Sequence, residues 1–315
     1  MTDVISTYKI HDIKGNFIKD IKLPGPGVSY GFGGSKNQSK TWYNFESLVH
    51  PPTVYMYDFF NDTSKEYYRS KAKFDKDKYV MKSDFYETKD GTRIPIFIAH
   101  KKDLVLDGLA PTLLYGYGGF NISQRPYFNK TIPVLLEKGG VYAVACIRGG
   151  GEYGEKWHEA GMLQNKQNVF DDFIAAGEYL IIERYTSSDR LAIRGGSNGG
   201  TLVGAVINQK PNLFRVAFPE VGVMDMLRYE QFTIGWAWAV EYGSVKNKKD
   251  FKNLLSYSPL HNIKEQSYPS VLVFTADHDD RVVPSHSYKY AAKLQKHQSS
   301  KNAPILIRIG KSTGH

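Results

Sequence analysis

A glycine-rich turn at Arg194–Gly200 (RGGSNGG) constrains the fold of this chain more than any other stretch. It follows an apolar run, Leu191–Ile193, and precedes a helix-like run, Thr201–Ile207. Strand, tight turn and helix are the context in which a Gly-x-Ser-x-Gly pattern forms a nucleophile elbow, a strained bend that presents a serine hydroxyl. Small neighbours are required because Cβ atoms would clash there, and the helix N-terminus favours developing negative charge. Ser197 is therefore a candidate nucleophile, and the alternative is a bystander serine in a glycine-rich turn.

The charge pattern argues against a nucleic-acid-binding protein. The 315 residues carry a formal charge of +9, from 41 basic and 32 acidic side chains. Lysine and arginine are interspersed with acidic residues instead of forming a stripe, which is typical of a solvated surface. No apolar run is long enough to span a bilayer, so we expect no membrane partner.

The single cysteine, Cys146, lies in an apolar run and leaves no internal disulfide to form. This fits a reducing compartment, and the first residues lack the basic start and apolar segment of a signal peptide. We therefore expect a cytoplasmic enzyme. Apart from Asp277-His278-Asp279, no set of His, Cys and carboxylate residues has the spacing of metal ligands, so we expect no metal and no cofactor.

Residues 1–71 are predicted to form a β-strand meander. Turn signals such as Lys14–Asn16 and Gly31–Gly34 separate segments rich in β-forming residues. The expected strands are Ile5–Ile10, Phe17–Leu23, Thr41–Val49 and Thr53–Phe59. Four antiparallel strands make one blade of a β-propeller, and one blade cannot close a ring. We interpret this part as a partial propeller, the remnant of its last blade or blades.

Residues 72–315 follow a different pattern, in which strands alternate with helices. A hairpin turn at Lys89–Thr92 joins two strand-like segments, residues 79–88 and 93–99. Later strands are expected at Thr112–Tyr115, Val141–Ile147, Leu191–Arg194, Val216–Phe218, Val271–Thr275 and Ile305–Ile309. Helices are expected at Ile132–Glu137, Val169–Arg184, Thr201–Gln209 and Ser285–Lys296. This alternation predicts an α/β domain with a mostly parallel, doubly wound sheet.

The residues after Ser197 fit the order of a catalytic triad. In α/β-hydrolases an acid follows a later strand and a histidine follows the last one. Asp277, Asp279 and Asp280 all follow the strand that ends at residue 275, and Asp279 lies furthest toward the loop crest, close to a basic residue. A solvated acidic turn is the alternative for this segment.

Among the histidines of this part, only His315 follows the last expected strand on a loop. His278 belongs to the acidic loop, and His286 and His297 lie in a helix-like run. A histidine at this place takes the proton of the serine hydroxyl and returns it to the leaving amine. His315 is therefore the candidate base, and an acid such as Asp279 would fix its tautomer.

An oxyanion hole requires preorganised donors that face the nucleophile. The backbone N–H of Asn198 is one candidate. The loop Tyr115–Phe120 (YGYGGF) follows an early strand, so its backbone or the Tyr117 hydroxyl is the other. A second glycine-rich loop, Arg148–Gly154, lacks the ending of a P-loop, and we interpret it as shaping the cleft. The aromatic segment Ile234–Tyr242 is either core or a flat pocket wall.

Taken together, these segments resemble the prolyl oligopeptidase family of cytosolic serine peptidases. The similarity covers about residue 72 to the end and also appears in the blade-like residues before it. It rests on Tyr115–Phe120, Arg148–Gly154 (RGGGEYG), Gly195–Gly200 (GGSNGG), Asp277–Pro284 (DHDDRVVP) and Gly314-His315. The resemblance implies an α/β-hydrolase fold with Ser197, Asp279 and His315 as the triad. It also implies the Asn198 N–H and the Tyr117 hydroxyl as oxyanion donors.

The resemblance further implies cleavage on the carboxyl side of proline in short peptides, through an acyl-enzyme. A substrate proline would stack on Trp238, and Arg281 would anchor a substrate carbonyl. The remaining pocket residues implied by the family are Phe120, Val223, Tyr242 and Val282. A proline ring suits such a slot because it is flat, apolar and already rigid. We expect a monomer that binds short proline-containing peptides.

The chain departs from the family pattern at both ends. The family has a seven-bladed propeller with a hydrolase segment before it, and a final helix after the catalytic histidine. We therefore expect this chain to be a fragment. The alternatives are a related α/β-hydrolase peptidase or esterase of other specificity, and a catalytically inactive interaction protein. An acidic pocket wall would favour cleavage after basic residues, but the sequence offers aromatic residues instead.

Overall fold

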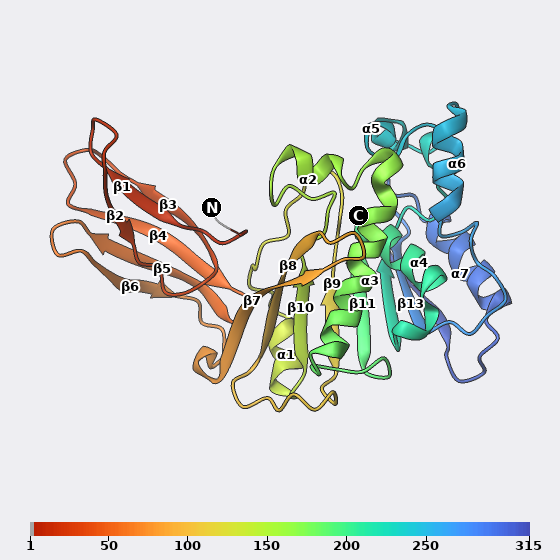
Figure 1. Ribbon diagram of the computed structural model, residues 1–315, viewed down its shortest axis with the longest axis horizontal. Helices are drawn as coiled ribbons and strands as arrows, with labels where there is room; N and C mark the ends of the chain where they lie inside the picture. Colours follow the sequence, from red (N-terminus) through yellow and green to blue (C-terminus); the bar gives the residue numbers. More distant parts are fainter. Residues whose placement is uncertain (1–2) are drawn as a thin grey trace. The chain divides into compact units, whose positions relative to one another are not determined.

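The computed structural model describes residues 3–315 (Figure 1). Contacts between Cα atoms divide the chain into two compact units. The first unit comprises Met1–Asp84, Phe97–Leu104 and Arg125–Tyr142. The second comprises Phe85–Ile96, Val105–Gln124 and Ala143–His315, and it contains every residue of the candidate site.

The first unit contains two antiparallel sheets close to its N-terminus. Strands β1 (Tyr8–His11) and β2 (Phe17–Ile21) form a pair. A four-stranded sheet pairs its members in chain order: β3 (Val28–Gly33), β4 (Lys40–Ser47), β5 (His50–Asp58) and β6 (Thr63–Arg69). Alternate residues of these strands bury an aromatic cluster that includes Tyr43, Phe45 and Tyr57. The four consecutive strands match the arrangement of one propeller blade.

Strand β3 lies where the sequence predicted a turn. Its register with β4 shifts between Gly31 and Gly33, and Phe32 adopts a φ of +64°. Such an irregularity is a β-bulge, in which one extra residue bends a strand without ending it. A Cβ atom on Gly31 would lie 2.8 Å from the Trp42 carbonyl oxygen, so glycine is required for this close pairing. The glycines therefore mark a bulge inside a strand, and the prediction of a turn there was wrong.

A mostly parallel eight-stranded sheet follows, in the order β14-β13-β12-β11-β9-β10-β8-β7. From one edge to the other the strands are Ile305–Gly310, Ser270–Ala276, Val216–Glu220, Leu191–Gly196, Thr112–Tyr115, Val141–Ala145, Arg93–Lys101 and Tyr79–Glu87. The neighbours from β9 through β11, β12 and β13 to β14 are all parallel. The expected strands of this part are all present, which confirms the predicted sheet.

Seven α-helices accompany the strands within residues 3–315. They are α1 (Ile132–Glu137), α2 (Glu155–Glu159), α3 (Lys166–Ile182), α4 (Asn198–Gln209), α5 (Ala239–Tyr242), α6 (Lys248–Tyr257) and α7 (Ser285–His297). Helix α4 packs against β11 and β12 and beside α3, and α7 packs against β13 and β14. Residues 198–207 of α4 are all buried, because this helix is apolar on nearly every side.

The sheet gathers several loops at one edge. The carboxyl ends of parallel strands meet at the same edge of a sheet, which is where ligands bind in such folds. Strands β9, β11, β13 and β14 end at Tyr115, Gly196, Ala276 and Gly310. The loops that carry Tyr117, Ser197, Asp279 and His315 therefore start from neighbouring points.

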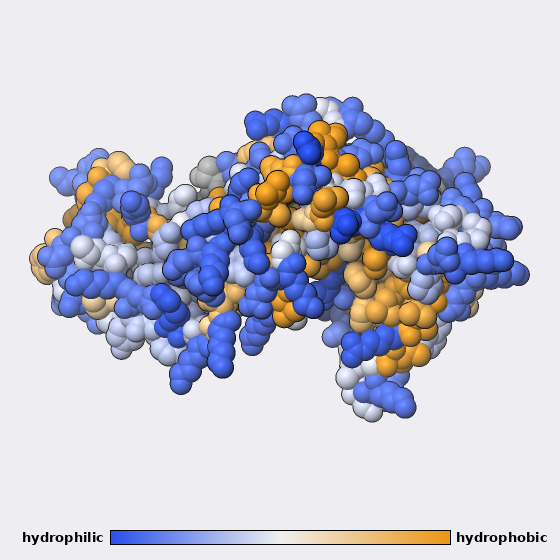
Figure 2. Space-filling model, turned by 90° about the horizontal axis from the view of Figure 1, so that it is seen from below, coloured by the Kyte–Doolittle hydropathy of each residue, from blue (hydrophilic) through white to orange (hydrophobic). Residues whose placement is uncertain are grey.

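The surface is largely hydrophilic on the face in Figure 2, with separate hydrophobic areas. Large apolar side chains that remain exposed include Trp236 and Val240. Between residues 3 and 315, no helix combines the length and the apolar character needed to cross a membrane.

A buried ion pair links α3 to the loop after β10. The Arg148 guanidinium donates from Nη2 to Asp172 Oδ1 (2.6 Å) and from Nε to Asp172 Oδ2 (2.9 Å). Arg148 is 5% exposed and Asp172 is fully buried. Arg148 also contacts Asp90 in the turn between β7 and β8, at 2.6 Å. The fork of five N–H donors thus satisfies two carboxylates from separate segments.

We predict that Asp172→Ala lowers the free energy of unfolding by about 3–5 kcal/mol, because it leaves the Arg148 charge buried without its main partner. The adjacent Asp171 pairs with Lys89, whose side chain is 71% exposed. Asp171→Ala is therefore the matched control and should cost about 1 kcal/mol or less. Urea unfolding of both variants measures the difference, and equal losses would contradict this account of the pair.

Candidate active site

The site begins at Ser197, between β11 and α4. Ser197 has a φ of +56° and a ψ of −119°, in a region that L-residues rarely adopt. Its N–H donates to the Glu220 carbonyl (2.9 Å), and its own carbonyl accepts from the N–H groups of Gly200 (2.9 Å) and Thr201 (3.2 Å). Strain of this kind persists only where the surroundings determine the backbone. The bend has the geometry expected of a nucleophile elbow.

Close backbone packing explains why glycine flanks the bend. A Cβ atom on Gly195 would lie 2.3 Å from the Gly199 carbonyl oxygen, and one on Gly199 would lie 2.6 Å from the Gly116 carbonyl oxygen. Contacts that short do not occur, so a larger residue at either position would force the turn apart. At Gly196 the nearest atom would be 3.8 Å away, so there is room for a side chain. The steric requirement therefore falls on Gly195 and Gly199, and also on Gly200, whose Cβ atom would lie 2.4 Å from the Glu220 carbonyl oxygen.

The structure brings Asp279 and His315 together. Asp279 Oδ2 lies 2.8 Å from His315 Nδ1. The other carboxylate oxygen, Oδ1, accepts the backbone N–H groups of Arg281 (3.0 Å) and Val282 (2.8 Å), which fixes its orientation. The Asp279 side chain is fully buried, and the His315 side chain is 23% exposed. With Nδ1 bonded to the carboxylate, Nε2 is the ring nitrogen that can accept a proton.

The other two acids of this loop have different surroundings. Asp277 is exposed and pairs with His278, with 2.6 Å between Oδ1 and Nδ1. Asp280 is exposed as well. The sequence left three candidates for the acid, and only burial and the bond to His315 separate them.

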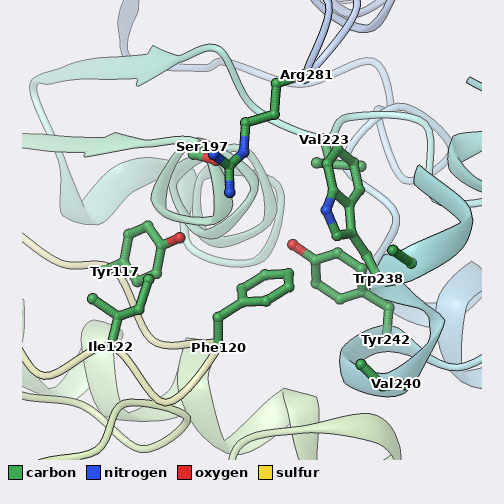
Figure 3. Close-up of a pocket in the computed structure, with 10 residues that line it drawn as sticks. Tyr117, Phe120, Ile122, Ser197, Val223, Trp238, Val240, Tyr242 and Arg281 are labelled. Atoms are coloured by element: carbon green, nitrogen blue, oxygen red, sulfur yellow. The ribbon is translucent and has the colours of Figure 1, made fainter. Parts of the chain in front are cut away.

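Asn198 and Tyr117 connect the elbow to the loop after β9. Asn198 Nδ2 donates to the Tyr117 carbonyl (2.6 Å), and Asn198 Oδ1 accepts from the Tyr242 hydroxyl (2.8 Å). Burial raises the pKa of Tyr117, and hydrogen bonding with Ser197 opposes this in part. The Tyr117 hydroxyl therefore stays protonated at neutral pH. It points into the pocket (Figure 3) and is a hydrogen-bond donor beside the candidate nucleophile.

An aromatic pocket of about 190 Å³ opens at Ser197. Figure 3 shows the rings of Phe120, Trp238 and Tyr242 around it. Phe120 meets Tyr242 edge-on, with 5.5 Å between ring centroids and an interplanar angle of 89°. Trp238 is nearly parallel to Tyr229 behind it, at 6.4 Å and 11°. Such packing holds the rings in place and leaves a flat apolar slot.

The pocket contains most of the residues expected from the sequence and three others. Val223, Arg281 and Tyr117 line it as well. The additional lining residues are Ile122, Ala237 and Val240. Ala237 and Val240 lie close to Trp238 in the segment Ile234–Tyr242, which the sequence left as either core or a flat pocket wall. No sequence pattern singled out Ile122.

Val282 was expected in the pocket wall, but it is not among the described residues that line this pocket. Its side chain is 2% exposed, and its N–H supports Asp279. In the structure this residue holds the acid loop.

The second glycine-rich loop packs against the loop that carries Tyr117. A Cβ atom on Gly149 would lie 2.7 Å from the Gly118 carbonyl oxygen, and one on Gly151 would lie 2.4 Å from Asn121 Oδ1. The glycines of this segment thus permit two backbones to touch, which is how the loop shapes the cleft.

Glu152 in the same loop is a buried carboxyl. It is 8% exposed, and its Oε1 accepts the Gln124 N–H at 2.7 Å. Its Oε2 has no hydrogen-bond partner among the described residues. Burial raises the pKa of Glu152 to about 7, although the backbone hydrogen bonds oppose this. The group therefore carries a proton in the folded state well above the ordinary pKa of a glutamate.

Residues 3–315 contain no group of three or more His, Cys, Asp or Glu side chains placed to hold a metal ion.

The sequence matches two family profiles. One, described as "Prolyl oligopeptidase family", covers residues 126–315. The other, described as "Prolyl oligopeptidase, N-terminal beta-propeller domain", covers residues 1–70. These matches confirm the predicted fold class, an α/β-hydrolase preceded by propeller-type strands.

Curated relatives match the whole chain but are much longer. The prolyl endopeptidase of Elizabethkingia miricola is 51% identical over 317 residues, which is 100% of this chain and 45% of that protein. The prolyl endopeptidase of Dictyostelium discoideum is 48% identical over 320 residues, 99% of this chain and 42% of that protein. The chain spans less than half the length of these relatives.

Solved structures agree closely with this fold. A structure from a study of two prolyl endopeptidases has a TM-score of 0.92 and 43% identity, and the match covers 99% of this chain and 46% of that one. Prolyl oligopeptidase B from Galerina marginata, bound to a 35mer hydrolysis and macrocyclization substrate, also has a TM-score of 0.92, at 36% identity. That match covers 98% of this chain and 44% of the other.

We predict that Glu152 makes stability depend on pH. Between its ordinary pKa of 4.5 and about 7, the folded protein holds a proton that the unfolded chain releases. The free energy of unfolding should therefore fall as pH rises through this window, by roughly 3 kcal/mol for a shift of this size.

Glu152→Gln places a neutral side chain of the same shape in this site at every pH, so this decrease should disappear. Urea unfolding at about pH 5 and about pH 8 measures it. The control is Glu159→Gln, at an exposed glutamate of α2, which should keep the wild-type difference. An unchanged pH dependence in Glu152→Gln would contradict the assignment.

Proposed function

The chain belongs to the prolyl oligopeptidase family, and we propose that it encodes a serine endopeptidase that cleaves on the carboxyl side of proline in short peptides. The observation that carries the proposal is that Ser197 and Trp238 line one aromatic pocket. A nucleophile at the edge of a flat apolar slot places the scissile carbonyl beside the hydroxyl while the slot holds the proline ring.

In this proposal Ser197 Oγ attacks the carbonyl carbon and His315 takes its proton. Asp279 holds the imidazole in the required tautomer and stabilises the imidazolium. The C–N bond then breaks, His315 returns the proton to the leaving amine, and the acyl group stays on Ser197. Water attacks the acyl-enzyme in the second half, with His315 again acting as the base. General acid–base catalysis of this type contributes about 10²–10⁴-fold.

The developing oxyanion would receive two hydrogen bonds, from the Asn198 N–H and from the Tyr117 hydroxyl. Both groups are held before substrate binds: Asn198 by Tyr242 and the Tyr117 carbonyl, and Tyr117 by burial beside Ser197. Preorganised donors need no reorganisation during the reaction, and one such donor contributes about 10²–10³-fold in kcat.

The pocket favours proline for physical reasons. Its wall offers the faces of Trp238, Phe120 and Tyr242, and no acidic side chain is among the described residues that line it. A rigid pyrrolidine ring loses little conformational entropy on entering such a slot. The Arg281 guanidinium is directed into the pocket (Figure 3) and would donate to a substrate carbonyl. A pocket for arginine or lysine would instead need a carboxylate.

Further parts of the proposal concern the chain as a whole. We propose a boundary near residue 72 between the propeller-type part, residues 1–71, and the catalytic part, residues 72–315. We also propose a cytoplasmic monomer that acts on free peptides. The single cysteine, Cys146, fits a reducing compartment. The Galerina relative is bound to a 35mer hydrolysis and macrocyclization substrate, which supports a peptide as the partner of this chain.

We predict that the chain cleaves a Gly-Pro-amide reporter and that Ser197→Ala lowers its kcat roughly a millionfold.

Trp238→Ala should lower kcat/KM for the proline reporter roughly 10- to 100-fold, because apolar contact and stacking are lost. It should affect a Gly-Ala-amide reporter far less. Steady-state kinetics on the proline, alanine and arginine amides and on a simple ester measures this selectivity.

Three outcomes would count against the proposal. Equal cleavage of the arginine amide would indicate a different peptidase, and cleavage of the ester alone would indicate an esterase. No turnover of any reporter by a folded chain would favour an interaction protein.

A further inference from the structure

A lysine ammonium lies buried beside the pocket and has no role in the chemistry above. Lys166 begins α3, and its side chain is 2% exposed. Its Nζ donates to the Gly118 carbonyl and to Glu241 Oε1, both at 3.0 Å. It also lies 5.3 Å from the centroid of the Tyr242 ring. Burying a charge is costly unless it is paired and hydrogen-bonded, and here both conditions are met.

The carboxylate partner lies on the helix that carries two pocket-lining residues, Val240 and Tyr242. Glu241 is 2% exposed, lies directly before Tyr242, and is on the same short helix, α5, as Val240. Its second oxygen, Oε2, contacts His158 Nε2 of helix α2 at 2.7 Å. Lys166, Glu241 and His158 thus join three separate helices behind the slot.

The carbonyl partner belongs to the loop that supplies the candidate oxyanion donor. Gly118 follows Tyr117 and has a φ of +66°. A Cβ atom on Gly118 would lie 2.3 Å from Val169 Cγ1, and one on Gly119 would lie 2.6 Å from Asn198 Nδ2. The loop is therefore packed tightly on both sides. The Tyr117 carbonyl accepts a hydrogen bond from Asn198, and the Gly118 carbonyl accepts one from Lys166.

We propose that Lys166 is a positioning residue for the peptidase reaction, which holds the Tyr117 loop in register with the helix that forms the pocket wall. This inference rests on the proposed function. Lys166 is not among the described residues that line the pocket, and it acts through the Gly118 carbonyl and Glu241. Stability alone is a weak reason for such a pair, because replacing a buried ion pair with neutral residues of similar volume is often neutral or stabilising. Catalysis gives a stronger reason, because a displacement of about 1 Å at a donor costs about 10²-fold.

The test is a double-mutant cycle between Lys166→Met and Tyr117→Phe, assayed on the Gly-Pro-amide reporter. Lys166→Met alone should lower kcat roughly 10- to 100-fold and change KM by less than about threefold. In the Tyr117→Phe background the same substitution should lower kcat less than about threefold, because the donor that Lys166 positions is already gone. Gln167→Met, the next residue on α3, is the control and should keep wild-type kcat; Gln167 bonds to Asp171 and Gln209.

Losing one partner of a buried pair can unfold a protein, so thermal unfolding is measured for each variant. If Lys166→Met does not fold, the double variant Lys166→Met/Glu241→Gln takes its place in the cycle. This double variant leaves neither the Lys166 ammonium nor the Glu241 carboxylate buried without its partner, and it still removes the hydrogen bond to the Gly118 carbonyl. Equal losses of kcat in both backgrounds would overturn the inference by indicating a structural role, and so would an unchanged kcat. If the wild-type chain cleaves no reporter, the proposed function itself fails; if it cleaves and Lys166→Met matches it, only the inference fails.

Discussion

The contact between three glycine backbones determines where Ser197 lies. Gly195, Gly199 and Gly116 pack so closely that a Cβ atom on either of the first two would overlap a carbonyl oxygen. This contact joins β11, the start of α4 and the loop after β9. It holds Ser197 in a positive-φ conformation that costs about 1–3 kcal/mol, and the helix that follows is buried. The strained serine is therefore a property of the packed sheet and helix.

The rest of the site follows from the parallel sheet. Because β9, β11, β13 and β14 end at one edge, the loops that carry Tyr117, Ser197, Asp279 and His315 start from neighbouring points of the sheet. Side-chain hydrogen bonds then refine the loops. Asn198 bonds to the Tyr117 carbonyl and to the Tyr242 hydroxyl, so the elbow, the candidate oxyanion loop and the pocket wall are joined through one amide. Backbone donors at Arg281 and Val282 orient Asp279 in the same way.

Local sequence patterns predicted the strands of residues 72–315 and the helices α1, α3, α4 and α7, because each has a clear apolar periodicity and a turn at its end. The elbow was predictable for the same reason. Helices α2 and α6 were not predicted. Strand β3 was missed because the glycines of a bulge look like those of a turn. Lys166 and Glu241 were missed because they are 75 residues apart in sequence, and no spacing rule connects a lysine on one helix with a glutamate on another. Likewise, three acids share one loop, and it is burial and the bond to His315 that distinguish Asp279 from its neighbours.

The central claim is that the bend makes Ser197 the reactive hydroxyl of the chain. A fluorophosphonate probe followed by peptide mass spectrometry tests this directly on the folded 315-residue chain. The account predicts a single adduct on Ser197, formed much more slowly in Asp279→Asn, which removes the charge that stabilises the His315 imidazolium. A folded chain with no adduct on Ser197, or with an adduct on a different serine, would contradict it.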